Sequence, residues 1–487
     1  MMMIGAMLFI PIITALLCFM MQKKRAVELV NLSGAAALCI AAVSPLKAAL
    51  SAPLYFMGNT FFLDALSAYF MGIIVIISLL TAIYSIDYMG QEFREGLVSI
   101  REIRIYYALM HLFVFTMLLA AASNNIAIFW IAIEGTTLVS ALLVGFYKNR
   151  QSIEAAWKYI ILCTVSITFA LLGIFIIYYA SVVTLGGHGT MNWTELRDIA
   201  EKLNPATVKL AFIFILLGYG AKAGIAPVHN WLPDAHSQAP TPISALLSGV
   251  LLKCAFLGIL RYVIIVNKAA GPLYSEHLLL FFGLLSMGLA TAFILMQNNY
   301  KRLLAYSSIE HIGIIAVGIG IGGFWGIYGS LLHVLNHAVV KTLLFFTTGR
   351  VRLKYHSTKI DKVKGAIEAL PVSGTVMLLA ALAIAGAPPF NIFLSEFTIM
   401  KAAVDSGSWI TFTLFIVFAT VIFGAIVYHF GKMTFGKSEK SRDIEWNRIS
   451  TYVIIIMAVV MLTLGIHLPS FLDSTLKSSV NIVMGGR

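Results

Sequence analysis

Ionisable side chains recur inside the longest apolar stretches of this sequence. They are Glu134, Lys222, Lys253, His311, His333, His337, Lys341, Glu396 and His429. Inside a lipid bilayer each such group costs about 2.5–3.5 kcal/mol on insertion scales, so a chain that keeps many of them has a use for them. A single histidine in an apolar helix is usually held by a structural hydrogen bond. Nine groups spread over seven stretches indicate proton or cation transfer instead, with His429, near the end of its stretch, the best candidate for a bystander.

Three of these groups share a regular spacing. His333, His337 and Lys341 follow one another at intervals of four residues. On a helix this spacing drifts by only about 40° per step, so the three form one polar stripe along roughly 12 Å. Histidine exchanges protons near neutral pH, and burial brings lysine and glutamate closer to the same range. A stripe of this kind suits proton hopping, because each group can gain and lose a proton at small cost.

The surrounding sequence is that of a membrane protein. Of its 487 residues 60% are hydrophobic and 11% charged, whereas a soluble domain has about 25% charged residues. A spanning helix needs about 20 apolar residues, and backbone groups in lipid must be satisfied within each helix. The chain is therefore predicted to be all-α with about fourteen spans and no need for strands. The expected spans are 3–21, 28–48, 62–86, 105–121, 125–146, 157–183, 207–226, 243–266, 277–297, 303–321, 324–349, 372–400, 408–431 and 450–472.

The distribution of basic residues predicts the orientation. With the N-terminus outside, the cytoplasmic loops hold about 22 Lys and Arg and the outer segments about seven, as the positive-inside rule requires. Both termini are then expected on the periplasmic or outer side of the cell inner membrane. This placement also explains the net charge of +12 without nucleic-acid binding. Arg261 and Lys401 lie near span ends, where long side chains ordinarily reach the interface.

Two spans are interrupted by glycine and proline. The seventh contains Gly224 and Pro227, and the twelfth contains Gly386, Pro388 and Pro389. Proline removes a helix donor, and paired interruptions in corresponding halves are typical of inverted-repeat transporters. One kink would mean little, but two beside ionisable groups predict two inverted five-helix repeats, helices 4–8 and 9–13. The expected division is 1–104, 105–266, 277–431 and 450–487.

The sequence offers no site for a redox cofactor. Cys18, Cys39, Cys163 and Cys254 are far apart, without the CxxC pairs of zinc or iron–sulfur sites. There is also no phosphate-binding loop or dinucleotide fingerprint. We therefore expect no cofactor, no metal and no catalytic residues in this chain, and any electron transfer to occur in partner subunits.

A longer motif resembles a known family. Residues 220–249, GAKAGIAPVHNWLPDAHSQAPTPISALLSG, are similar to the core signature of the antiporter-like subunits of complex I and Mrp antiporters. In that family a glutamate in helix 5 pairs with a lysine in helix 7, and groups in helices 8, 10 and 11 lead to a charge in broken helix 12. The resemblance implies proton-translocation roles for Glu134, Lys222, Lys253, His311, His333, His337, Lys341 and Glu396. It also implies cytoplasmic entry near Lys222 and Lys253 and exit near Glu396.

The twelfth span indicates which members of this family the chain resembles. Its segment 388–397, PPFNIFLSEF, carries glutamate where Mrp-type subunits more often carry lysine. This form resembles component F of hydrogenase-4 and formate-hydrogenlyase-type complexes, with a glutamate-bearing complex I subunit next. The implied function is translocation of protons or Na⁺, with other membrane subunits and a peripheral redox arm as partners. Two alternatives stay open: a subunit of an Mrp-type Na⁺/H⁺ antiporter without redox partners, and a scaffold that no longer pumps.

Overall fold

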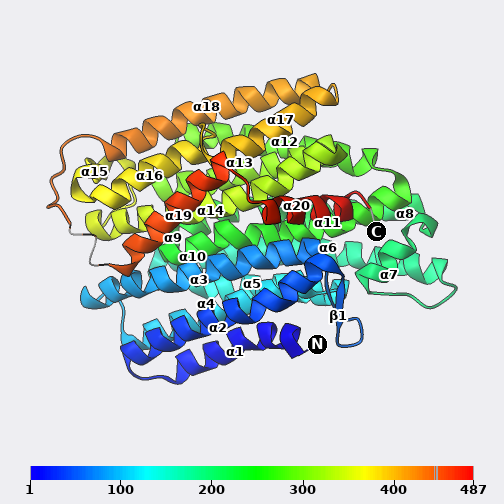
Figure 1. Ribbon diagram of the computed structural model, residues 1–487, viewed down its shortest axis with the longest axis horizontal. Coiled ribbons are helices and arrows are strands. Elements are labelled where there is room, and N and C mark those ends of the chain that lie inside the picture. Colours follow the sequence, from blue (N-terminus) through cyan, green and yellow to red (C-terminus); the bar gives the residue numbers. More distant parts are fainter. Residues whose placement is uncertain (1, 444, 446–447, 486–487) are drawn as a thin grey trace.

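The computed structural model describes residues 2–443, 445 and 448–485, and they form a bundle of long helices running along one axis (Figure 1). The helices are α1 (Met2–Met20), α2 (Lys24–Ser51), α3 (Ala65–Arg94), α4 (Ile100–Ala122), α5 (Ile126–Val144), α6 (Arg150–Thr184), α7 (Trp193–Asp198), α8 (Pro205–Ala223), α9 (Trp231–Gln238), α10 (Thr241–Leu246), α11 (Leu252–Ala270), α12 (Leu273–Leu295), α13 (Tyr300–Ile321), α14 (Gly323–Tyr355), α15 (Ala366–Ala369), α16 (Pro371–Ile384), α17 (Asn391–Asp405), α18 (Trp409–Thr434), α19 (Ile449–Ile466) and α20 (Ser470–Val483). Short η segments, η1 (Ala200–Lys202), η2 (Leu247–Leu251) and η3 (Ile360–Lys362), complete the helical part.

The predicted all-α membrane class is confirmed. Twelve of the described helices are long and apolar enough to cross a membrane, and two shorter apolar helices, Ile4–Met20 and Pro371–Ile384, accompany them. Residues 241–270 form one such crossing, made of α10, η2 and α11. The total of fourteen spans and the inverted repeats stay predictions.

A small hairpin was not expected. Strands β1 (Leu54–Phe56) and β2 (Phe61–Leu63) pair antiparallel, with Leu54 opposite Leu63. The hairpin lies between α2 and α3, outside the long apolar helices, so it does not conflict with the helical requirement inside lipid. The predicted span 62–86 therefore begins later, at Ala65, because the three residues before Asp64 belong to β2.

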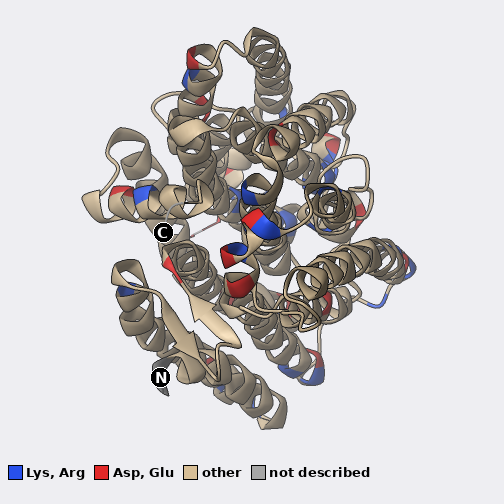
Figure 2. Ribbon diagram, turned by 90° about the vertical axis from the view of Figure 1, so that its right-hand side faces the viewer, with Lys and Arg blue, Asp and Glu red and all other residues tan. Residues whose placement is uncertain are grey.

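The helices divide into an inner and an outer set. In the apolar windows of α13, α14 and the α10–α11 crossing, at least 94% of residues are buried, against 28% in α2 and α18. Figure 2 looks at the bundle with many helices seen end-on, and most of their residues carry no charge. The outer helices therefore present the apolar face that a bilayer requires, whereas the inner helices are enclosed by protein.

Helix α3 ties the N-terminal segment to the rest of the bundle. It packs against α10, α14, α19 and α20. The Tyr69 hydroxyl donates to the Leu331 carbonyl at 2.6 Å, and the Tyr84 hydroxyl donates to the Phe346 carbonyl at 2.7 Å. The N-terminal helices thus share the core of the later ones, and the four-part division of the chain stays a prediction.

Arg261 does not reach an interface as the sequence suggested. Its guanidinium forms two bonds to the Asp64 carboxylate, at 2.6 and 2.7 Å, and lies over the Trp193 ring. Both side chains are buried. Burial alone would raise the pKa of Asp64, but the Arg261 charge, with the hydrogen bonds to Arg261 and Ser67, holds it below its usual range. The pair joins the start of α3 to α11.

The C-terminal segment also differs from its predicted form. The expected span 450–472 ends at Ile466, and a separate helix, α20, begins at Ser470 after Pro469. Proline cannot continue a helix, so the chain turns before it. Figure 1 shows that α1 begins and α20 ends toward the same end of the bundle.

Candidate functional site

The first helix interruption lies where the sequence placed it. Helix α8 ends at Ala223, and Gly224 adopts φ +89°, in the left-handed region that favours glycine. A Cβ on Gly224 would lie 2.8 Å from a methyl carbon of Leu232. The Trp231 indole N–H donates to the Ala221 carbonyl at 2.9 Å, which also accepts from the Gly224 N–H at 3.2 Å, so the segment after the interruption is tied to the end of α8.

Lys222 sits in the last turn of α8, beside this interruption. Its ammonium is buried and donates to Thr137 Oγ1 at 2.8 Å and to the Tyr159 hydroxyl at 2.5 Å. It also lies over the rings of Tyr159 and Trp231, at 4.5 and 5.7 Å from their centroids. Aromatic faces and hydroxyl groups therefore stabilise this lysine in place of water.

Glu134 on α5 reaches Lys222 through a hydroxyl. Thr137 Oγ1 accepts from Lys222 and donates to Glu134 Oε2 at 3.3 Å. Thr164 Oγ1 donates to Glu134 Oε1 at 2.7 Å. The carboxylate and the ammonium thus interact through one threonine, and this Glu134–Thr137–Lys222 set is called the first cluster below.

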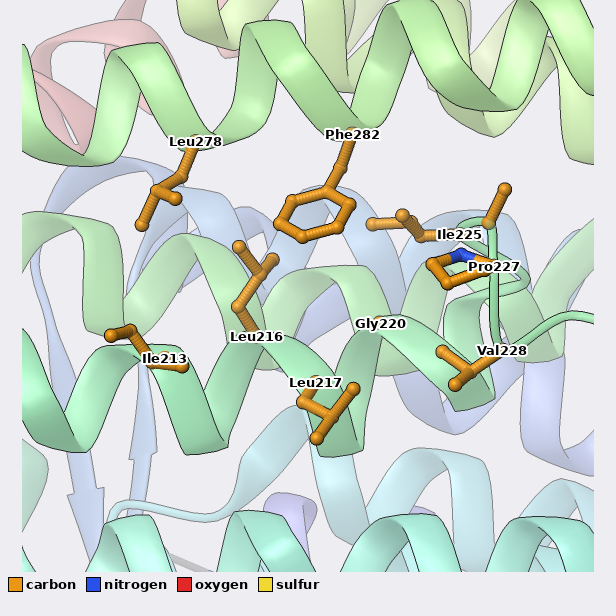
Figure 3. Close-up of a pocket in the computed structure, with 10 residues that line it drawn as sticks. Ile213, Leu216, Leu217, Gly220, Ile225, Pro227, Val228, Leu278 and Phe282 are labelled. Carbon is orange, nitrogen blue, oxygen red and sulfur yellow. The ribbon is translucent and has the colours of Figure 1, made fainter.

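An apolar cavity lies on the other side of the first interruption. It encloses about 100 Å³ between α8, α12 and the segment after Gly224. In Figure 3, Leu278 and Phe282 from α12 point toward Leu216 and Pro227. A cavity lined only by apolar side chains stays dry, so ions and protons have no route through it. It gives the interrupted helix room on the side away from the first cluster.

The second interruption separates α16 from α17. Gly386 adopts φ +81°, and a Cβ built there would collide with the Glu396 carboxylate. Glu396 is buried on α17 and therefore packs directly against the backbone of the interruption. The missing side chain at position 386 creates the space for the carboxylate.

Substitution of Gly386 by alanine is therefore expected to displace Glu396. A non-glycine residue at a positive φ costs about 1–3 kcal/mol, and the added methyl group occupies the carboxylate's position. We expect ion translocation by the assembled complex to fall with little loss of assembled protein. Gly407→Ala is the control, because Gly407 also has a positive φ but a Cβ there meets open space. Equal behaviour of the two variants would contradict the expectation.

The histidines converge next to Glu396. His311 Nδ1 and His333 Nε2 are 2.9 Å apart, and His333 Nδ1 is 2.9 Å from Ser395 Oγ. One side-chain atom each of His311, His333 and Glu396 lies within 4.8 Å of the other two. The His337 ring stacks on His311 with centroids 4.7 Å apart. Helices α13, α14 and α17 thus bring four predicted residues into contact.

Two lysines extend this group along α14 and α11. The Lys341 ammonium donates to the Leu304 carbonyl at 2.6 Å, and the Lys253 ammonium donates to the Ser248 carbonyl. Ser248 belongs to η2, a π-helical turn, and π-turns free backbone carbonyls inside helices. Lys253 interacts electrostatically with Lys341 and His337. The second cluster consists of Lys253, Lys341, His337, His311, His333 and Glu396.

A buried carboxylate beside the second cluster was not among the predicted site residues. Glu310 is buried on α13 and interacts electrostatically with Lys341 and Glu396. Its Oε2 has no hydrogen-bond partner among the described residues. It lies inside the predicted span 303–321, so the criterion that selected His311 also selects Glu310. His429, by contrast, lies against the backbone of Ile294 and Leu295 on α12.

The eight predicted residues therefore fall into two groups. Glu134 and Lys222 form the first cluster, and the other six belong to the second. Among the described residues no hydrogen bond joins the two clusters directly. Between Lys222 and Lys253 the chain forms α9, α10 and η2. Trp231 of α9 covers Lys222, and His236 of α9 lies within electrostatic reach of Lys253 and Lys341.

Comparisons with known proteins identify the family. Residues 123–423 match the family described as "NADH:quinone oxidoreductase/Mrp antiporter, TM", and residues 57–95 match "NADH-Ubiquinone oxidoreductase (complex I), chain 5 N-terminus". A hydrogenase-4 component F homolog of Methylacidiphilum infernorum is 39% identical over 78% of this chain and 80% of its own length. The resemblance seen in residues 220–249 and 388–397 is thereby confirmed.

Solved structures show the same fold. A chain of an archaeal membrane-bound sulfane sulfur reductase superposes with a TM-score of 0.88 and 25% identity, over 99% of this chain and 97% of its own. A chain of the Mrp complex of Dietzia sp. gives a TM-score of 0.87 at 19% identity, over 99% of this chain and 98% of its own. The protein is thus a multi-pass membrane subunit that belongs to the NADH:quinone oxidoreductase/Mrp antiporter family.

Proposed function

We propose that this chain translocates protons or Na⁺ across the membrane as one subunit of a redox-driven complex of the hydrogenase type. The observation that carries the proposal is the pair of buried clusters. Of nine ionisable groups, including Glu310, eight are buried and Glu134 is half-buried. Each costs free energy inside an apolar helix, so their retention indicates a function. The hydrogenase-4 relatives support a redox partner rather than an isolated transporter.

The first cluster acts as a charge switch in this proposal. A proton on Glu134 removes the carboxylate charge that Thr137 transmits to Lys222. The Lys222 ammonium then loses part of its stabilisation and can release its own proton. The Tyr159 hydroxyl and the rings of Tyr159 and Trp231 keep the lysine in place during this exchange. Proton uptake by Glu134 on α5 is therefore coupled to proton release by Lys222 on α8, although the two charged groups are not in direct contact.

The second cluster supplies the transfer path. Lys253 and Lys341 hold like charges near each other, so a proton on one lowers the proton affinity of the other. His337, His311 and His333 stack and hydrogen-bond in sequence toward Ser395 and Glu396. Imidazole can accept a proton on one ring nitrogen and release it from the other. A proton can thus move from the lysines to Glu396 at the second interruption.

The membrane location, the partner subunits and the repeat organisation are also part of this proposal. We infer a bacterial-type inner membrane location with both termini on the outer side, supported by the excess of Lys and Arg in the opposite loops. The partners are other membrane subunits and a peripheral redox arm, by analogy with the multisubunit assemblies in which similar chains occur. The two interrupted helices support the two inverted five-helix repeats.

The test is translocation by the reconstituted complex. Proteoliposomes receive the electron donor, and proton and Na⁺ movement are recorded together with electron transfer. Lys341→Ala is expected to stop translocation, because it removes the central proton carrier of α14. Unchanged translocation in this variant would contradict the proposal. Na⁺/H⁺ exchange driven by an ion gradient, without any electron donor, would favour the Mrp-type antiporter, whose fold this chain shares.

A further inference from the structure

A polar hollow opens where α5 ends and α6 begins. It encloses about 370 Å³ and is lined by Tyr147, Gln151, Ser237, Gln238, Arg352 and Thr358, among others. A neighbouring hollow of about 430 Å³ shares Gln151, Ser237, Gln238 and Thr358 with it. Both hollows therefore reach the end of α9, the short helix that follows the first interruption. Their polar walls suit water, in contrast to the apolar cavity on the other side of α8.

A buried carboxylate lies directly behind Arg352 and Tyr147. The Glu92 side chain is fully enclosed on α3, and its Oε1 accepts from Arg352 at 2.7 Å and from the Tyr147 hydroxyl at 2.6 Å. Its other oxygen, Oε2, has no hydrogen-bond partner among the described residues. A buried polar atom without a partner is costly, so this free oxygen requires an explanation.

Two further buried groups continue inward from Glu92. Lys301 on α13 interacts electrostatically with Glu92 and Arg352, and its ammonium donates to the Ala239 carbonyl at 2.6 Å. His236 on α9 lies within electrostatic reach of Lys301, Lys253 and Lys341. Neither ring nitrogen of His236 has a partner among the described residues, and its ring stacks on Phe345. These groups connect the polar hollow with the second cluster.

We propose that Glu92 and His236 form the entrance through which protons pass from the polar hollow to Lys253 and Lys341. The inference rests on the proposed function, because it adds an entrance to that path. A hydronium in the hollow gives its proton to Glu92 Oε2, which becomes a neutral acid. The proton then passes to a free nitrogen of His236, and from its other nitrogen to an unprotonated Lys253 or Lys341. Glu92 returns to the carboxylate and re-forms its pair with Arg352.

Lys301 is a positioning residue in this entrance. It holds the end of α9 through the Ala239 carbonyl, three residues beyond His236. Its ammonium interacts electrostatically with both Glu92 and His236, and its positive charge opposes a second positive charge on His236. A proton therefore cannot rest on His236 but moves onward or back. Arg352 and Tyr147 keep Oε1 of Glu92 occupied, which directs proton uptake to Oε2.

Glu92→Gln in the assembled complex tests the carrier role. Glutamine keeps an oxygen for Arg352 and Tyr147 but cannot carry a proton. We expect the number of protons translocated per electron to fall by about tenfold or more, because proton transfer through a lost acid–base group falls by at least this factor. A merely structural ion pair predicts a lower unfolding temperature with an unchanged number of protons per electron, and that result would overturn the entrance. His236→Phe should reproduce the loss of translocation.

A labelling experiment tests the hollow without disturbing the buried groups. Ser237→Cys lines both hollows, and Ser441→Cys, on an exposed loop, lines neither. A charged, membrane-impermeant thiol reagent should block translocation in Ser237→Cys when added from the loop side and have no effect on Ser441→Cys. Full translocation by labelled Ser237→Cys would overturn the proposal.

Comparison with Lys341→Ala distinguishes failure of the entrance from failure of the proposed function. If Lys341→Ala stops translocation while Glu92→Gln and labelled Ser237→Cys translocate normally, only the entrance is refuted. If Lys341→Ala also translocates normally, the proposed function fails as well.

Discussion

Lys222→Ala and Glu396→Ala are each expected to lower ion translocation by the assembled complex by about 100-fold or more, the scale of a lost proton-transfer group. Lys222 is the cation that interacts with Glu134 through Thr137. Glu396 terminates the histidine path at the second interruption. Removing Lys222 disables the switch of the first cluster, and removing Glu396 interrupts the transfer path of the second cluster at its end. The measurement is proton or Na⁺ uptake per electron in proteoliposomes.

Two further variants make the result specific. Lys222→Arg keeps the positive charge but removes proton exchange, because arginine stays protonated. It should therefore be as defective as Lys222→Ala if the lysine must release its proton. Lys401→Ala is the matched control for Glu396, since Lys401 lies exposed on the same helix and forms a surface ion pair with Asp405, at 2.5 Å. Normal translocation in Lys222→Ala and Glu396→Ala would refute the assignment of both residues.

Asp64→Ala is expected to destabilise the protein by about 3–5 kcal/mol, the usual cost of leaving one member of a buried ion pair alone. The change strands the buried Arg261 guanidinium and removes the cap that Asp64 provides to Ser67 at the start of α3. Thermal unfolding in detergent should show a clearly lower midpoint. Because Arg261 lowers the pKa of Asp64, the stabilisation is fully present above the unfolded value of about 3.9 and is lost as the pH falls through the folded value.

An exposed pair provides the comparison for Asp64. Arg197 and Asp198 lie 2.9 Å apart on α7 with the carboxylate largely in solvent. Asp198→Ala should change stability by less than about 1 kcal/mol, because surface ion pairs contribute little. The double variant Asp64→Asn/Arg261→Met should recover part of the lost stability, since it leaves no buried charge. Equal midpoints for Asp64→Ala and Asp198→Ala would show that the buried pair is not a main source of stability.

Local sequence features were sufficient to predict the membrane class and the positions of the helix interruptions. Apolar length locates the spans because lipid forbids unsatisfied backbone groups, whatever the neighbouring helix is. The interruptions at Gly224 and Gly386 are local too, since glycine and proline act on their own turn of helix. The His333–His337–Lys341 stripe follows from helical periodicity alone, and the structure places all three side chains in the interior.

Pairings between segments far apart in the chain could not be predicted from local sequence features. Asp64 and Arg261 are separated by 197 positions, and only the packed bundle brings them together. The prediction that Arg261 reaches an interface was wrong for this reason. Likewise, the spacing of charges could not show that Trp231 covers Lys222. Glu92 lies beyond the end of the predicted span 62–86, so its burial behind Arg352 gave no signal in the sequence.

The enclosure of α13 and α14 has a consequence for the surrounding lipid. A thinner or thicker bilayer acts first on the outermost helices, and the least buried apolar windows are those of α2, α6 and α18. The ionisable side chains of α13 and α14 are shielded from this stress, because the apolar windows of both helices are 94% buried. Transport should therefore tolerate changes in acyl-chain length that alter the tilt of the peripheral helices.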